Sequence, residues 1–84
     1  MERVIVRVEN VKSFFEYGKP ILIFIDAPAN VGNVLYCSAT GHGEGDYNAL
    51  LQQSRPIKEE ELNSLWFYGY DLKNFRIVKK FMKK

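Results

Sequence analysis

Pro20-Ile-Leu-Ile-Phe-Ile25 is the stretch that decides the fold, because it is continuously apolar and rich in β-branched residues. A strand with one face in solvent alternates apolar and polar residues, whereas this run contains no polar position. The run therefore predicts a strand that is buried on both faces and lies in the middle of a sheet. It is far shorter than the roughly 20 apolar residues that a membrane-spanning helix needs.

The residues around this central run predict two more strands and a short helix. Residues 2–8 alternate valines with other side chains, as a half-buried strand does. Asn10 suits the N-cap of a short helix that Gly18 ends. Turn-forming residues 26–33 then lead to an extended segment at 34–39, and this order predicts a hairpin with the central strand.

The second half of the chain predicts two helices and a final strand. Asp46 can cap a short helix that runs to Gln53. A second helix is expected from Pro56 to Leu65, because proline suits the first helical turn and the acidic residues after it favour the positive end of the helix dipole. Residues 75–82 favour a strand, although the apolar spacing of this segment also fits a helix.

The predicted order is β-α-β-β-α-α-β, which indicates an α+β fold. We expect a small single domain over residues 1–84, with an antiparallel or mixed four-stranded sheet and helices packed on one face. The chain is 46% hydrophobic and 14% aromatic, which is enough for a real core and excludes global disorder. No linker or internal repeat divides the sequence.

Composition also narrows the classes of function. Cys37 is the single cysteine, so an intramolecular disulfide and a paired-cysteine metal or redox motif are excluded. The N-terminus lacks the basic-then-apolar plan of a signal peptide, and the expected location is the cytoplasm, with no membrane association. The net charge of +2 is too small to indicate a nucleic-acid partner by itself.

Residues 40–46 read T-G-H-G-E-G-D and offer the densest group of polar side chains between a predicted strand and a predicted helix. The glycines match the opening of a dinucleotide-binding loop, but Asp46 stands where the last glycine belongs, and two carboxylates would repel phosphates. His42, Glu44 and Asp46 alternate and could converge on a metal, with Cys37 as a remote fourth ligand. A small-ligand or metal site would be built around this loop and Asp26. The simpler interpretation is a mobile acidic loop whose Asp46 caps the next helix.

Catalytic interpretations are weaker than structural ones throughout the chain. Cys37 and His42 could form a nucleophile and its base, but a lone cysteine inside a predicted strand is usually a small buried apolar residue. Asp26 follows the buried strand and could act in acid-base chemistry, whereas a turn-stabilising role is the commoner one. We therefore expect no catalytic residue, no cofactor and no enzymatic activity.

The stretch G-K-P-I-L-I-F-I-D-A-P at 18–28 is similar to the central strand of the thioredoxin family. The resemblance covers about eleven residues. The paired cysteines of that family would fall just after Pro28, where this chain has Ala-Asn-Val-Gly-Asn. No functional residue is transferred from the family to this sequence.

The C-terminal quarter combines aromatic and basic residues and is the predicted partner surface. Between residues 73 and 84 there are six basic residues and no acidic one. Trp66 and Phe67 end a predicted helix and are expected in the core. The predicted partner-binding residues are Tyr68, Tyr70, Arg76, Lys79 and Lys80.

These observations leave three hypotheses of function. The leading one is a small non-enzymatic interaction module, an inhibitor or adaptor, that binds a protein partner through the aromatic and basic surface. The second is a single-stranded DNA- or RNA-binding protein that stacks bases on the aromatic residues and contacts phosphates with the lysines. The third is a small-ligand or metal site at Gly41–Asp46. A short chain rich in apolar residues also suggests a homodimer.

Overall fold

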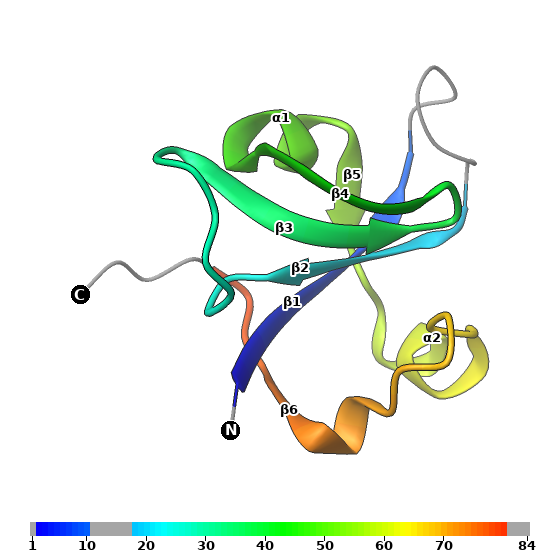
Figure 1. Ribbon diagram of the computed structural model, residues 1–84. Coiled ribbons are helices and arrows are strands. Elements are labelled where there is room, and N and C mark those ends of the chain that lie inside the picture. The colour runs from blue at the N-terminus through cyan, green and yellow to red at the C-terminus, as the bar shows by residue number, and fades with distance from the viewer. Residues whose placement is uncertain (1, 11–17, 81–84) are drawn as a thin grey trace.

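The computed structural model describes residues 2–10 and 18–80, which form a mixed sheet of six strands with two helices (Figure 1). The α+β class is therefore confirmed, while the predicted four-stranded sheet is too small. The strands are β1 (Glu2–Glu9), β2 (Pro20–Phe24), β3 (Asn33–Ser38), β4 (Gly41–Asp46), β5 (Ser54–Pro56) and β6 (Phe75–Ile77). The helices are α1 (Tyr47–Gln52) and α2 (Glu59–Ser64), and a 3₁₀ turn spans Leu72–Asn74.

The strands lie in the order β4-β3-β2-β1-β5, and β6 also pairs with β1. Neighbours along β4-β3-β2-β1 are antiparallel, and this confirms the predicted hairpin of β2 with β3. β5 pairs antiparallel with the end of β1, whereas β6 pairs parallel with its beginning. β1 therefore pairs with three other strands, more than any other strand of the sheet.

Both faces of the sheet carry apolar clusters, so β1 is buried on both sides and is not the half-buried strand that its alternation predicts. Ile5 belongs to one cluster, while Val4 and Val6 belong to the other. Leu50 of α1 packs into the first cluster, and Leu62 of α2 packs against the second. Figure 1 shows α1 and α2 on opposite sides of the sheet, which corrects the prediction that the helices share one face.

Two strands were not predicted. Residues 41–46 were expected to be a mobile loop, but they form β4 and pair with the whole of β3. β5 takes residues from the predicted start of the second helix, and α2 begins at Glu59 because Pro56 pairs with Arg7 of β1. Arg7 strengthens this pairing by donating to the Ser54 hydroxyl (2.7 Å) and to the Ser54 carbonyl (2.8 Å).

The remaining expectations have mixed outcomes. The Asp46 carboxylate accepts a hydrogen bond from the Ala49 amide (2.9 Å), which confirms it as the N-cap of α1. The strand interpretation of the final segment holds over Phe75–Ile77, and the helical alternative is limited to the 3₁₀ turn before it. The predicted short helix after Asn10 lies outside the described residues. None of the helices within residues 2–10 and 18–80 is long and apolar enough to cross a membrane.

Candidate aromatic binding pocket

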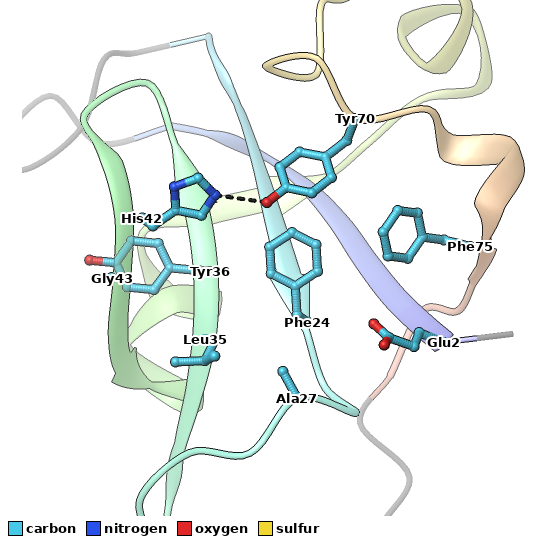
Figure 2. Close-up of a pocket in the computed structure, with 9 residues that line it drawn as sticks. All are labelled: Glu2, Phe24, Ala27, Leu35, Tyr36, His42, Gly43, Tyr70 and Phe75. Carbon is cyan, nitrogen blue, oxygen red and sulfur yellow. Dashed lines mark hydrogen bonds between the residues drawn. The ribbon is translucent and has the colours of Figure 1, made fainter.

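A pocket of about 270 Å³ opens on the sheet face that α2 covers in part (Figure 2). It is lined by residues from β1, β2, β3, β4 and β6, from the turn after β2 and from the segment between α2 and the 3₁₀ turn. We call it the aromatic pocket; its lining residues are Glu2, Phe24, Ala27, Leu35, Tyr36, His42, Gly43, Tyr70 and Phe75.

Three rings form the centre of the aromatic pocket. The centroids of Phe24 and Tyr70 lie 5.2 Å apart, those of Phe24 and Phe75 lie 5.9 Å apart, and those of Tyr70 and Phe75 lie 6.1 Å apart. The rings are inclined to one another by 45–66°, so none stacks flat on another. All three side chains are only partly buried. Their contacts hold the rings in place while part of each ring stays accessible.

A hydrogen bond of 2.8 Å between His42 Nε2 and the Tyr70 hydroxyl fixes one wall of the pocket. Because His42 lies on β4 and Tyr70 lies some thirty residues later in the chain, this bond joins the sheet edge to the segment after α2 (Figure 2). The imidazole also meets the Tyr70 ring edge-on, with centroids 6.0 Å apart. Tyr70 is thereby oriented by its hydroxyl as well as by its ring.

The turn that positions Tyr70 has a tyrosine where glycine or asparagine is usual. The Tyr70 amide donates to the Phe67 carbonyl (3.0 Å), and the two residues between them, Tyr68 and Gly69, have φ values of +59° and +88°. Positive φ at both central positions is typical of a type I′ turn, where glycine and asparagine are the preferred residues. A tyrosine is tolerated here because its hydroxyl donates to the Pro20 carbonyl (2.7 Å).

This turn exposes a residue that sequence reasoning placed in the core. Phe67 is buried as expected, but Trp66 is 72% exposed. Its indole ring meets the Tyr68 ring edge-on at 5.4 Å, and both line a second hollow with Lys19 and Pro20. Trp66 and Phe67 are adjacent aromatic residues, and what distinguishes them is that Phe67 belongs to the buried cluster of Val4, Val6 and Leu22.

The four residues of the predicted ligand or metal site have separate structural partners. Asp26 accepts hydrogen bonds from the Arg3 amide (2.7 Å) and from the Arg3 guanidinium (2.6 Å), and the bond to the guanidinium raises the pKa of Arg3. Glu44 accepts from the side-chain amides of Asn33 and Asn30, and these bonds lower its pKa. Asp46 caps α1 and His42 contacts Tyr70, as described above. No three His, Cys, Asp or Glu side chains within the described ranges are grouped to hold a metal ion.

Cys37 is a direct cross-strand neighbour of His42, but its environment does not favour nucleophilic chemistry. The side chain is 2% exposed within the cluster under α2, and burial raises the pKa of its thiol. The reactive form of cysteine is the thiolate, which a raised pKa makes scarce at neutral pH. The expectation of a small buried apolar residue is confirmed.

The five predicted partner-binding residues fall into three places. Tyr70 lines the aromatic pocket, and Tyr68 lines the hollow beside Trp66. Arg76 is exposed on β6, next to Arg3 in the neighbouring strand. Lys79 and Lys80 are exposed beyond β6. Comparison of the chain with protein-family models, curated proteins and solved structures found no match.

Proposed function

We propose that this protein is a non-enzymatic interaction module that receives a side chain of a protein partner in the aromatic pocket. The observation that carries the proposal is the trio of Phe24, Tyr70 and Phe75, whose rings come from three separate elements, contact one another and together form one wall of an open, largely apolar hollow. Pockets that bind a partner's side chain combine apolar walls with a few polar groups that fix orientation. His42 and Glu2 supply those polar groups here.

The exposed indole of Trp66 supports a protein partner as well. Tryptophan is among the residues that contribute most at protein interfaces, because it buries a large rigid surface with little loss of side-chain entropy. Trp66 lies one residue before the turn that ends at Tyr70 and lines a different hollow, so it offers the partner a second contact outside the aromatic pocket. Lys79 and Lys80, which are exposed beyond β6, then provide basic groups for the polar rim of such an interface.

A single-stranded nucleic acid is the second candidate, and one observation favours it. Trp66 and Lys19 line the same hollow of about 260 Å³, where a base could stack while the ammonium contacts a phosphate. The aromatic pocket itself is less suited, because its lining includes the Glu2 carboxylate and, within residues 2–10 and 18–80, neither lysine nor arginine. We therefore prefer the protein partner.

The proposal is tested by filling the pocket. Ala27 lines the pocket, and Figure 2 shows its methyl group directed towards Phe24. Peptides selected from a random display library against the whole chain are titrated against the Ala27→Trp variant, in which an indole occupies the hollow. We expect their affinity to fall about tenfold or more, as it does when a dominant interface contact is lost.

Ala29→Trp is the matched control, since Ala29 is exposed and does not line the pocket. It introduces the same side chain two residues further along and should leave affinity unchanged. Circular dichroism establishes that both variants are folded. Selected peptides that bind the two variants equally well would refute the proposal. An oligonucleotide that binds both variants, with an affinity that falls steeply with salt, would favour the nucleic-acid alternative.

A further inference from the structure

The aromatic pocket has a charge opposite to that of the whole chain. The chain carries a net charge of +2, yet among the lining residues that the structure describes Glu2 contributes the one carboxylate, and none is a lysine or an arginine. Figure 2 shows the Glu2 carboxylate directed towards the space beside Phe24 and Phe75. The pocket therefore presents negative charge at its rim.

Two arginines close to the pocket in the sequence do not direct their charge into it. The Arg3 guanidinium is paired with Asp26 at 2.6 Å. Arg76 follows Phe75 on β6, and successive side chains of a strand point to opposite faces, so Arg76 points away from the face that holds the Phe75 ring. A cation that enters the pocket thus meets a carboxylate without meeting a basic side chain of the lining.

The rings add to this negative character. The face of an aromatic ring carries negative electrostatic potential, and a cation within about 6 Å of the centroid is attracted to it. Because Phe24, Tyr70 and Phe75 are mutually inclined, their faces are not hidden by flat stacking. One guest can consequently contact more than one ring.

Side-chain hydrogen-bond acceptors are few among the described lining residues, and this restricts the kind of cation. An arginine guanidinium has five donors and a lysine ammonium has three strongly hydrated ones, and each must be satisfied when water is removed. The Tyr70 hydroxyl already bonds His42, and Glu2 is the one carboxylate of the lining. A methylated ammonium carries its charge with few or no donors, and its methyl groups suit apolar walls.

We propose that the side chain received by the aromatic pocket is a methylated lysine of the partner protein, held by the faces of Phe24, Tyr70 and Phe75 and by the Glu2 carboxylate. This inference rests on the proposed function, since it names the chemical class of the group that the same pocket would bind. A volume of about 270 Å³ accommodates a trimethylammonium group together with part of its aliphatic chain.

The test compares a cation with a neutral molecule of the same shape. The whole chain is titrated, by NMR of its aromatic side chains, with N-acetyl-trimethyllysine methylamide and with the analogue in which carbon replaces the charged nitrogen. We expect the ring signals of Phe24, Tyr70 and Phe75 to shift with the cation, and the neutral analogue to bind about 3- to 30-fold more weakly. Choline should bind more weakly than the lysine derivative, because it lacks the chain that contacts the pocket wall.

Two variants complete the test. Glu2→Gln keeps the shape of an exposed side chain but removes its charge. It should weaken binding of the cation severalfold and leave binding of the neutral analogue unchanged. Glu59→Gln is the control, because it removes an exposed carboxylate of α2 that does not line the pocket. It should change neither the affinity for the cation nor the affinity for the neutral analogue.

The outcomes separate this inference from the proposed function. Equal binding of the cation and its neutral analogue would overturn the methylated lysine while leaving a side-chain pocket intact. The methylated lysine would also be refuted if the trimethyllysine derivative shifts none of the ring signals while Ala27→Trp still weakens the binding of the selected peptides. In that case the side-chain pocket would again remain. If choline binds as tightly as the lysine derivative, the pocket serves a free quaternary ammonium and the methylated lysine is again refuted.

Discussion

At the scale of single residues, the glycines of β4 are explained by one tyrosine. Tyr36 of β3 is directly opposite Gly43, and its ring covers the backbone of β4. A Cβ atom at Gly43 would lie 2.6 Å from the Tyr36 hydroxyl oxygen, whereas one at Gly45 would lie 3.3 Å from the ring. The glycine-rich stretch is therefore a flat strand surface for an aromatic ring, and this requirement replaces the mobile loop that composition alone indicated.

Gly43→Ala should consequently destabilise the protein, whereas Gly45→Ala should be close to neutral. The first substitution forces the Tyr36 ring to move, which is an overpacking cost of about 1–3 kcal/mol. The second requires a shift of a few tenths of an ångström, and the lower entropy of unfolded alanine relative to glycine offsets part of that cost. Urea unfolding of both variants gives the two free energies.

A Tyr36→Leu background tests whether the Tyr36 ring is the cause of this destabilisation. Leucine lacks the hydroxyl and the distal ring atoms that a Cβ at Gly43 would meet. The cost of Gly43→Ala should therefore be smaller in this background than in the wild-type protein. Equal costs in the two backgrounds would show that Tyr36 is not the reason for glycine at this position.

At the scale of elements, α2 is attached to the sheet through an ion pair with β5. Arg55 donates to both carboxylate oxygens of Glu61 at 2.8 and 2.7 Å. The Lys58 amide also donates to Glu61 (3.0 Å) at the start of α2. The bonds from Arg55, followed by the bond from Lys58, lower the pKa of Glu61 from 4.5 to about 2.

The stability of the protein should therefore depend on Glu61 in acid. A carboxyl group with a lower pKa in the folded state stabilises the fold above its unfolded pKa, and this contribution is lost as the pH falls from about 4.5 through about 2. Glu61→Gln, which can still accept from the Lys58 amide, should flatten the decline in melting temperature over this range. Arg55→Gln should flatten it as well, because it removes the cation. A Glu61→Gln variant with the full wild-type decline would contradict this assignment.

Elements with a strong local pattern were predictable, and those defined by their partners were not. The apolar run of β2 and the Asp46 cap of α1 follow from side chains that act within a few residues of themselves. β4 and β5 depend on pairing with β3 and β1, and neither has the alternation or β-branched content that marks a strand in sequence. Propensity was overridden there by contacts between distant residues.

The same distinction applies to the candidate site. Tyr70 was predicted as a contact residue from its place in an aromatic run, and it does line the aromatic pocket. Phe24 was expected as pure core, because its strand is continuously apolar, yet it is partly accessible. A pocket assembled from β2, β4 and β6 depends on a topology that no local pattern encodes. Trp66 was misplaced for a related reason, since packing against distant strands decides which of two adjacent rings is buried.

At the scale of the whole molecule, β1 joins two apolar clusters that lie on opposite faces of one sheet. Ile5 and Ile23 pack in the cluster under α1, whereas Val6 and Leu22 pack in the cluster under α2. Neighbouring residues of the same two strands belong to different clusters. The strands therefore cannot separate from one cluster without disrupting the other. Self-association remains a separate prediction, for which the edge strand β4 offers one exposed side of the sheet.

This arrangement predicts that the protein unfolds in one transition even when a single face is weakened. Ile23→Val removes one methylene group from the first cluster and should cost about 0.5–1.5 kcal/mol. Val6→Ala removes two carbon atoms from the second cluster and should cost more. In urea, the methyl NMR signals of Leu50 on one face and Leu62 on the other should disappear at the same midpoint in each variant, and that midpoint should be lower than in the wild-type protein. A Leu62 signal that is lost before the Leu50 signal in Val6→Ala would show that the α2 face unfolds independently, and β1 would then not couple the two clusters.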